Sequence, residues 1–172
     1  MSLEELYRQH ANMVYNVALG HTGNVEDAEE ITQDVFVKVH QKLDTFNEDA
    51  QVSTWIYRIV VNTSLDYLKA KKRKKRWAFM SSIFDKETET SMPKEFNHPG
   101  AQLESKEALS KIYMALDQLN ERQKSVIILA KVEGKSQKEI GEIMEMSPKA
   151  VESLLQRAKK NLAEILKQNE GL

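Results

Sequence analysis

Hydrophobic residues recur at helical spacing through most of the chain. In the first half, apolar residues three and four positions apart predict helices over residues 3–20 and 26–43, and a long helix that begins near residue 53. Asn24 and Ser53 precede the second and third of these patterns and are expected to cap them. Residues 45–52 have neither the helical nor the strand period, which predicts a loop.

The second half of the chain predicts four more helices. Apolar periodicity resumes at Leu103, and Asn120 and Ser136 each open a capping-box sequence before a further apolar run. Ser147 and Pro148 suit the cap and the first position of a last helix, which extends past residue 160. No segment alternates apolar and polar residues convincingly as a strand would, so the sequence predicts an all-α fold.

A polar segment separates the two halves. Residues 81–101 lose the periodicity and contain two of the three prolines of the chain. Such a composition is typical of a linker. The sequence therefore predicts two small helical domains, residues 1–78 and 105–172, joined by a flexible linker over residues 79–104.

Composition narrows the classes of function. The chain has 172 residues and no cysteine, which excludes a disulfide scaffold and a Cys-ligated metal site. No apolar run reaches the length of a membrane span, and residues 1–19 lack the unbroken apolar core of a signal peptide. We therefore expect a cytoplasmic protein.

Charge is distributed unevenly along the chain. The net charge of −1 combines −7 in residues 1–68, +7 in residues 69–76, −3 in residues 77–104 and +2 in residues 105–172. The near-neutral total thus conceals an acidic block next to a dense basic one. A local basic block of this density favours a polyanionic partner.

The basic block follows the third predicted helix. Clustered Lys and Arg side chains favour nucleic acid through counterion release, and aromatic neighbours such as Trp77 offer stacking surfaces for unpaired bases. On the same helix, Trp55, Asn62 and Asp66 share one face, which suits capture of a single-stranded base. The alternatives for the basic block are a solvated helix end or, in a eukaryote, a nuclear localisation patch, and the alternative for the aromatic residues is that they complete the core.

The last two predicted helices suit a helix-turn-helix, whose second helix enters the major groove. If Val151, Leu155 and Ala158 face the core, the helical period turns polar residues outward that can contact base edges or phosphates. An ordinary helical hairpin would have the same polarity, so this pattern alone leaves both interpretations open. In the second predicted helix, Phe36 and Val37 lie beside the main apolar stripe, which indicates a surface for a protein partner.

Catalytic and metal chemistry is poorly supported. The four His are scattered, and the chain lacks HExxH, GxSxG and a glycine-rich phosphate loop. We expect no catalytic residue, no metal, no cofactor and no small-molecule substrate.

Three segments, taken in order, resemble the extracytoplasmic-function (ECF) group of bacterial sigma factors, the small initiation subunits of RNA polymerase. DAEEITQDVFVKVHQKLDTF is similar to the family's core-binding segment, and STWIYRIVVNTSLDYLKAKKRKKR to its promoter-melting segment. LDQLNERQKSVIILAKVEGKSQKEIGEIMEMSPKAVESLLQRAKKNL is similar to its promoter-reading domain. The resemblance covers residues 3–76 and 105–167, and the three motifs together are highly specific.

The resemblance implies a role for each segment. Core RNA polymerase would bind Gln33, Asp34, Phe36, Val37 and Lys38. The −10 element would be recognised and melted by Trp55, Tyr57, Arg58, Asn62, Lys69, Lys71, Lys72, Arg73, Lys74, Lys75 and Arg76. The −35 element would be read by Ser136, Gln137, Ser147, Lys149, Glu152, Ser153, Gln156, Arg157 and Lys160. The polymerase would supply the chemistry, so the chain itself would not be an enzyme.

The partners implied are core RNA polymerase and promoter DNA. Many members of the family are held inactive by an anti-sigma factor, often membrane-bound, so such a partner is a further candidate. The chain departs from the family in having Glu145 where the turn often has Gly, and Glu152 and Leu154 where basic residues are frequent. Two rival functions are a self-sufficient regulator that uses only the helix-turn-helix, and a helical adaptor whose basic run meets acidic protein or lipid.

Overall fold

The computed structural model describes residues 2–46, 51–84 and 103–170. Every regular element in these ranges is helical, which confirms the all-α prediction. In chain order the elements are α1 (Leu3–Thr22), α2 (Val25–Lys42), the 3-10 helix η1 (Leu43–Thr45), α3 (Val52–Phe84), α4 (Leu103–Asp117), α5 (Glu121–Ile127), the π-helical turn η2 (Ile128–Val132), α6 (Gln137–Met144) and α7 (Pro148–Glu170).

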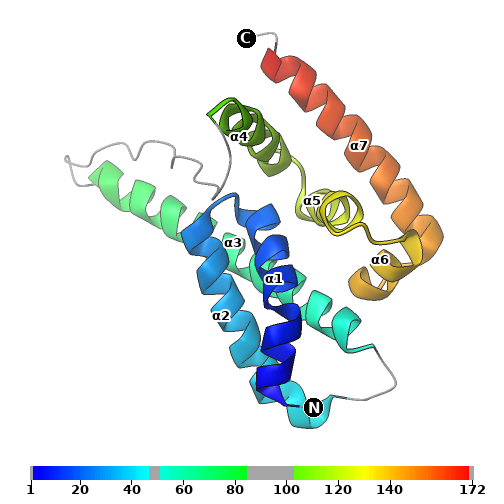
Figure 1. Ribbon diagram of the computed structural model, residues 1–172. Helices are drawn as coiled ribbons and strands as arrows, with labels where there is room; N and C mark the ends of the chain where they lie inside the picture. Colours follow the sequence, from blue (N-terminus) through cyan, green and yellow to red (C-terminus); the bar gives the residue numbers. More distant parts are fainter. Residues whose placement is uncertain (1, 47–50, 85–102, 171–172) are drawn as a thin grey trace.

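The helices form two bundles (Figure 1). Helices α1, α2 and α3 pack against one another in an N-terminal bundle, and α4, α5 and α6 pack on α7 in a C-terminal bundle. Fully buried aliphatic side chains fill both bundles, among them Ile31 and Ile56 in the first and Leu129 and Ile140 in the second. Burial of each such side chain contributes about 1.5–3 kcal/mol.

Local sequence signals place most of the helix ends. Asn24 caps α2 by accepting a hydrogen bond from the Asp27 amide at 2.9 Å, and Gly23 ends α1 with a φ of 61°. Ser136 and Glu139 form the predicted capping box of α6. Asn120 caps α5, but the Gln123 side chain accepts a hydrogen bond from Asn161 rather than completing a capping box.

Helix α3 departs from the prediction at both ends. It begins at Val52, so Ser53 lies in its first turn and is not the cap. It continues to Phe84, into the segment that the sequence assigns to the linker. The remainder of that segment, residues 85–102, and residues 47–50 of the predicted loop lie outside the described residues.

Helices α6 and α7 form the predicted helix-turn-helix. Glu145 adopts a left-handed conformation in the turn, with φ 55°, and Ser147 Oγ accepts a hydrogen bond from the Ala150 amide at 3.2 Å. A Cβ on Gly141 would lie only 2.6 Å from the carbonyl oxygen of Met146, so this close approach requires glycine. On α7, Leu154 is buried, and Leu155 is half-buried and packs against the core, as the sequence predicts.

The two bundles contact each other through α1 and α3. Helix α1 packs on η2, and α3 packs on α6. Lys124 of α5 is buried at this contact, where its Nζ donates to the carbonyl oxygen of His21 at the end of α1 and to Asp117. Helix α7 lies on the side of the C-terminal bundle that faces away from α1, α2 and α3 (Figure 1).

The described ranges contain neither a membrane-spanning helix nor a metal-binding cluster. No helix there is long and apolar enough to cross a bilayer. No group of three or more His, Asp or Glu side chains there is arranged to hold a metal ion.

Candidate nucleic-acid interface

One face of α3 carries five of the eleven side chains predicted to contact the −10 element, together with Asp66. We call this face the α3 stripe, and it consists of Trp55, Arg58, Asn62, Asp66, Lys69 and Arg73. These residues recur every three or four positions on the side opposite the buried Ile56, Val60 and Thr63. A hollow on this helix is lined by Asp66, Lys69, Lys72 and Arg73. Three cations around one hollow suit a phosphate group.

Trp55, at the start of the stripe, and Asn62, in its middle, differ in how exposed their side chains are. Trp55 is half-buried because its ring stacks on Phe46, with centroids 4.7 Å apart, so it supports the chain where the predicted loop begins. Asn62 is exposed. Asn62 is therefore the more accessible of the two side chains.

Tyr57 and Arg58 are held by the C-terminal bundle, which the sequence does not predict. Only 5% of Tyr57 is exposed, and its hydroxyl donates to Glu133 Oε2 at 2.7 Å. Burial raises the pKa of Tyr57, and the Glu133 carboxylate raises it further. Arg58 donates from Nε and Nη2 to the carbonyl oxygen of Glu142 at 2.9 and 2.6 Å, and its Nη1 lies 3.6 Å from Glu145 Oε1.

Two of the predicted phosphate contacts are also engaged within the protein. Lys69 lies 3.4 Å from Glu121 of α5, and Lys71 pairs with the buried Asp27. The part of the basic block that is exposed and lies outside these two ion pairs is residues 72–76, which we call the basic tail. Five adjacent cations on the surface of a helix remain available for a polyanion.

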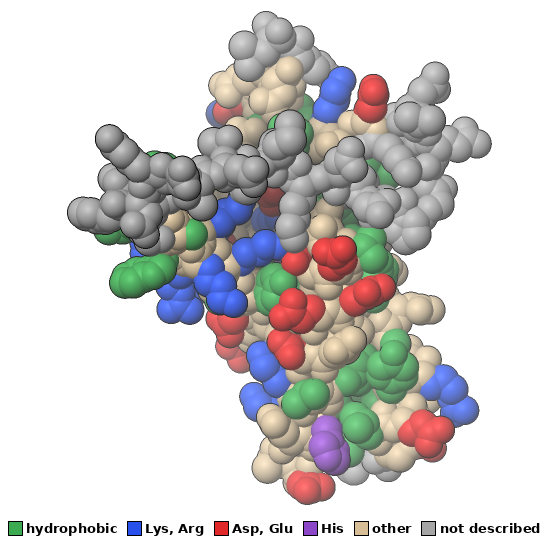
Figure 2. Space-filling view, turned by 90° about the vertical axis from the view of Figure 1, so that its left-hand side faces the viewer, with side chains coloured by type: hydrophobic (Ala, Val, Ile, Leu, Met, Phe, Trp, Pro, Cys, Tyr) green, Lys and Arg blue, Asp and Glu red, His purple; other side chains and the backbone are tan. Residues whose placement is uncertain are grey.

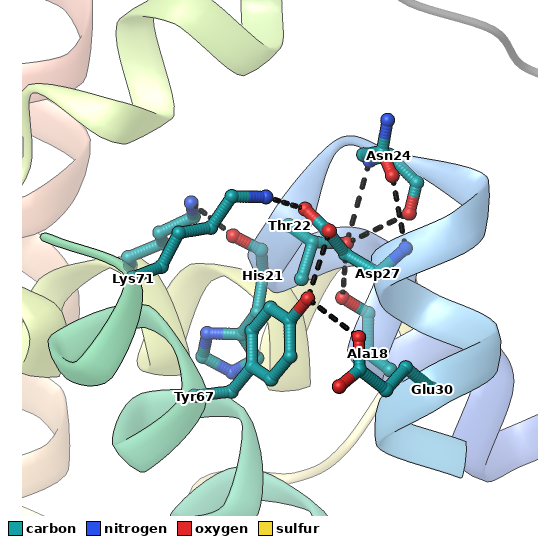
Figure 3. A network of polar contacts seen from close by, with 9 residues as sticks. Ala18, His21, Thr22, Asn24, Asp27, Glu30, Tyr67 and Lys71 are labelled. Carbon is teal, nitrogen blue, oxygen red and sulfur yellow. Dashed lines mark hydrogen bonds and ion pairs between the residues drawn. The ribbon is translucent and has the colours of Figure 1, made fainter. Parts of the chain in front are cut away.

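Lys71 belongs to a polar network that joins α2 to α3 (Figure 3). The Tyr67 hydroxyl lies 2.9 Å from both Asp27 Oδ1 and Glu30 Oε2, and Lys71 approaches the other oxygen of Asp27. Burial and these two carboxylates raise the pKa of Tyr67. The network gives Lys71 a structural partner, and Asp27, which the helical pattern places outside the apolar stripe, is buried in it.

The predicted polymerase-binding residues of α2 are split between surface and core. Gln33, Asp34 and Val37 are exposed, Val37 by 53%. Phe36 is only 6% exposed because it packs on Tyr7, with ring centroids 4.7 Å apart, so it belongs to the core. Lys38 is half-buried and donates from Nζ to Thr63 Oγ1 at 3.0 Å.

The surface near these helices carries charges of both signs. Figure 2 shows one face of the molecule on which acidic side chains gather next to Lys and Arg side chains, with apolar side chains exposed nearby. Tyr7 and Val37, each slightly more than half exposed, are two of the large apolar residues at the surface of the N-terminal bundle.

The predicted −35 residues of α7 lie on its exposed side. Lys149, Glu152, Ser153, Gln156, Arg157 and Lys160 are all exposed. Arg157 Nε donates to the carbonyl oxygen of Ser153 at 3.3 Å, a contact within one helix turn. Ser136 and Ser147 serve as helix caps, and Gln137 is exposed at the start of α6. The helix-turn-helix thus presents its polar face to solvent.

The sequence did not single out the residues at which the bundles meet. In the sequence, Glu133 and Glu142 look like ordinary solvent-exposed charged residues. Glu145 is the one local signal of this contact, because the family often has Gly at that position of the turn. His21 is fully buried there, and neither ring nitrogen has a hydrogen-bond partner among the described residues. Burial, with the nearby Lys124 charge, lowers the pKa of His21 to about 3.

Comparison with known families agrees with the division into two bundles. Residues 6–74 match the model of sigma-70 region 2, and residues 109–162 match the model of sigma-70 region 4. The first match falls on α1 to α3 and the second on α4 to α7.

Similar proteins and structures belong to the same group. The ECF RNA polymerase sigma-E factor of Escherichia coli K12 is 31% identical over 134 residues, which are 77% of this chain and 70% of that protein. SigE, an ECF RNA polymerase sigma factor of Mycolicibacterium smegmatis, is 29% identical over 168 residues, which are 96% of this chain but 62% of that protein. This chain therefore spans less than two thirds of the mycobacterial relative.

Two solved structures share the fold. CnrH, in complex with the cytosolic domain of CnrY, has a TM-score of 0.68 at 23% identity, over 96% of this chain and 88% of CnrH. The sigma factor RpoE, in complex with the anti-sigma factor NepR from Bartonella quintana, has a TM-score of 0.66 at 21% identity, over 95% of this chain and 96% of RpoE. Together with the family models and the relative in E. coli, they establish that the chain belongs to the ECF sigma factors of the sigma-70 family.

Proposed function

We propose that this protein binds core RNA polymerase and directs promoter-specific initiation of transcription. Residues 1–78 act as the domain that binds polymerase and melts the −10 element, residues 105–172 read the −35 element, and residues 79–104 link them. The main support is the pairing of a region 2 match on α1 to α3 with a region 4 match on an exposed helix-turn-helix. The polymerase performs the chemistry, so the chain acts in the cytoplasm as a regulator and not as an enzyme.

Helix α7 supplies the proposed reading of duplex DNA. Glu152, Ser153 and Gln156 are exposed near the N-terminus of the helix. Glu152 suits a hydrogen bond from cytosine, Gln156 suits adenine, and Ser153 suits either base. Lys149 and Lys160 lie nearer the two ends of this surface and suit phosphates. The groove-facing residues therefore include fewer cations than the family often has, which favours weak binding of duplex DNA by the free chain.

Helix α3 supplies the proposed capture of the melted strand. The basic tail places five cations in the C-terminal half of α3, and Asn62 and Trp55 lie toward the start of the helix. A single strand that runs along the stripe would have its phosphates held by the tail while unstacked bases reach Asn62 and Trp55. Tyr57 and Arg58 can take part only after the C-terminal bundle has released them.

Helix α2 supplies the proposed polymerase contact, which Gln33, Asp34 and Val37 carry. Phe36 supports this surface from the core by packing on Tyr7. An anti-sigma factor is a further proposed partner, because the structures of CnrH and RpoE contain a second protein and that of RpoE is named an anti-sigma factor.

Transcription with purified components tests this function. Core polymerase from a bacterium, mixed with the chain and genomic fragments, is expected to give discrete transcripts that are absent without the chain. Val37→Asp should abolish complex formation with core because it places a charge in an apolar contact, whereas Lys159→Asp, on exposed α7 outside the predicted contacts, should leave the complex intact.

The rival functions give other outcomes in the same assay. A self-sufficient regulator would bind specific duplex DNA tightly without polymerase, and an adaptor would show no dependence on DNA at all. If no complex with core forms and no transcript appears, the proposed function is wrong.

A further inference from the structure

We propose that the C-terminal part of α3 is a reversible anchor for an anionic lipid bilayer: the basic tail binds the lipid headgroups while Trp77, Phe79 and Met80 enter the interface. We call these three residues the apolar tip. The inference goes beyond the proposed function, because it adds a lipid surface to polymerase and promoter DNA as a partner. The lipid contact itself does not depend on that function.

The apolar tip is a cluster of large apolar side chains at the surface. Trp77 is 77% exposed, Phe79 66% and Met80 52%. A single exposed apolar residue needs no explanation, whereas several together mark a surface that binds a protein, a ligand or a membrane. The tip is therefore a candidate interaction surface.

This part of α3 has no buried side. Every residue from 72 to 80 is exposed, over about 12 Å of helix axis at 1.5 Å per residue. In Figure 1, this end of α3, in green, extends past the ends of α1 and α2. The helix thus presents its whole circumference to the surroundings, unlike its first turns, where Ile56 and Val60 are fully buried.

The charge next to the tip is of one sign. Residues 67–84 contain seven Lys or Arg residues and no acid, and the five of the basic tail lie outside the ion pairs of Lys69 and Lys71. Figure 2 views the side toward which this end of α3 points, and shows Lys and Arg side chains with apolar side chains beside them. Four to eight clustered cations on a helix are typical of binding to anionic lipid.

Cations and apolar residues are separated along the helix axis and not on opposite faces of it. The basic tail occupies residues 72–76, and the apolar tip begins at the next residue. A helix that meets a bilayer with its end would place the tip about 5–10 Å deep, at the boundary of the acyl chains. The Lys and Arg side chains would then lie at the level of the headgroups, which their long stems can reach.

The composition of the tip suits the interface of a bilayer. Tryptophan is enriched where headgroups meet acyl chains, because its ring is apolar and its N–H is polar. A basic segment or one apolar group binds a membrane only weakly, and stable attachment takes two signals together. The basic tail and the apolar tip supply both signals within nine consecutive residues.

The arrangement of the tip favours lipid over a single strand of nucleic acid. Trp77 and Phe79 are two positions apart, so they project about 200° apart around the helix, at 100° per residue. A strand that follows one face of the helix can stack on only one of the two rings, whereas a bilayer surrounds the helix. Met80 has no ring on which a base could stack.

Lipid and the melted strand would compete for the same cations. This step rests on the proposed function, since it assumes that the basic tail holds phosphates of the −10 strand. A chain at the membrane would therefore be withheld from promoter opening until it is released. The exposed polar residues of α7 lie in the other bundle and are not part of the anchor.

Sedimentation of the purified chain with vesicles tests the charge requirement. The chain should sediment with vesicles of equal parts phosphatidylcholine and phosphatidylglycerol, and stay in solution with phosphatidylcholine alone. Replacing the basic tail by Gln should weaken binding by at least about a hundredfold, because each cation contributes roughly fivefold. The matched control replaces five exposed lysines of the C-terminal bundle by Gln and should retain binding: Lys111, Lys131, Lys138, Lys159 and Lys167.

A second pair of variants tests the apolar tip. Trp77→Ser/Met80→Ser removes apolar surface without altering any charge and should weaken binding about tenfold. Met114→Ser/Val132→Ser is the matched control, because these side chains are 62% and 58% exposed and lie in the C-terminal bundle. All four positions are exposed, so the variants should fold as the wild type does.

Tryptophan fluorescence reports whether the tip enters the bilayer. The chain has two tryptophans, so Trp55→Phe leaves Trp77 as the only one. Emission of Trp77 should shift to shorter wavelength on addition of anionic vesicles and be quenched by lipids with brominated acyl chains. An excess of a single-stranded oligonucleotide should displace the chain from the vesicles.

Three results would overturn the proposal. The first is no sedimentation with anionic vesicles, and the second is binding that loses nothing in Trp77→Ser/Met80→Ser and leaves Trp77 emission unshifted, which is adsorption by charge alone. The third is a shift without lipid that grows with protein concentration, which would assign the tip to a second copy of the chain. Transcripts without vesicle binding would refute the anchor alone, and vesicle binding without a complex with core polymerase would refute the proposed function alone.

Discussion

The two proposed DNA surfaces of this protein are in different states in one structure. On α7, every predicted contact is exposed, and Arg157 bonds within its own helix. On α3, Tyr57, Arg58 and Lys69 are all held by the opposite bundle. The proposed −35 surface is therefore exposed in this structure, whereas part of the proposed −10 surface is covered by the C-terminal bundle.

The difference follows from the kinds of DNA that the two surfaces meet. Duplex DNA is present at all times, but a single strand exists only after the polymerase has begun to open the promoter. If α3 binds the melted strand as proposed, the contacts of Tyr57, Arg58 and Lys69 with the C-terminal bundle would keep these groups from binding other polyanions before that moment. The cost of covering is small because exposed ion pairs such as Lys69 with Glu121 contribute at most about 1 kcal/mol.

The largest expected effect comes from the part of the α3 surface that is not covered. Replacing all five residues of the basic tail, 72–76, by Gln should reduce the slope of log affinity against log salt for a single strand by about 3.5, because each neutralised phosphate accounts for roughly 0.7 of that slope. Binding titrations over a range of salt concentrations measure this slope.

Lys71→Gln is the matched control for the tail. Lys71 pairs with Asp27, so its replacement should lower the free energy of unfolding and leave the salt slope nearly unchanged. A slope that falls by as much for Lys71 as for one residue of the tail would show that the pair with Asp27 opens on binding.

A smaller effect is expected from the turn that supports α7. Gly141→Ala should destabilise the C-terminal bundle by roughly 1–3 kcal/mol, because the new methyl group would lie 2.6 Å from a backbone oxygen that cannot easily move. Denaturant unfolding measures this destabilisation. Duplex binding should weaken in parallel, whereas an unchanged stability would mean that the turn is looser than its geometry indicates.

Acid should weaken the contact between the bundles through His21. Burial, together with Lys124, lowers the pKa of His21 to about 3, so between pH 6.5 and 3 the unfolded chain binds a proton that the folded chain does not. The free energy of unfolding therefore falls as the pH drops through this window, by about 2 kcal/mol between pH 7 and pH 5.

Unfolding curves of His21→Leu at both pH values check this effect. The variant should lose most of the pH dependence attributed to His21, and His40→Gln, at an exposed position, should retain it. Equal pH dependence in wild type and His21→Leu would assign the effect to other groups.

The smallest expected effects concern single side chains of α7. Gln156→Ala should cost about 1–3 kcal/mol of discrimination at one base pair, and Lys160→Ala should weaken binding of all sequences while reducing the salt slope for duplex DNA by about 0.9. Competition binding with promoter fragments that carry single base-pair changes distinguishes the base-specific effect of Gln156→Ala from the uniform effect of Lys160→Ala. If Lys160→Ala changes the preferred sequence, Lys160 reads a base and not a phosphate.

Local features of the sequence predict most of the fold. The caps at Asn24 and Ser136 and the exposed face of α7 follow from hydrogen-bonding side chains and helical spacing within a few residues. Phe36 could not be assigned in this way, because only the position of Tyr7 on α1 decides that its ring is buried. A helical pattern shows which residues share a face but not which faces other helices cover.

The state of the −10 surface could not be predicted for the same reason. Lys71 pairs with Asp27, and the Tyr57 hydroxyl donates to Glu133. In each case the partner lies far away in the sequence. Glu133 and Glu142 look like ordinary solvent-exposed charged residues in the sequence. The π-helical turn η2, which brings Glu133 to the contact, has no known signature in the pattern of apolar residues. Among the acidic residues at the contact, Glu145 departs locally from the family pattern, which often has glycine in this turn, and its side chain lies near Arg58.

The most direct test of the central claim is the distance between the bundles when core polymerase is added. With dyes on Gln41→Cys and Lys159→Cys, two exposed positions in a chain without native cysteine, the protein should show a short distance alone and a longer distance on saturation with core polymerase. A distance that stays short in a complex that still makes promoter-specific transcripts would contradict the claim that the α3 stripe is covered in the free chain and released by polymerase.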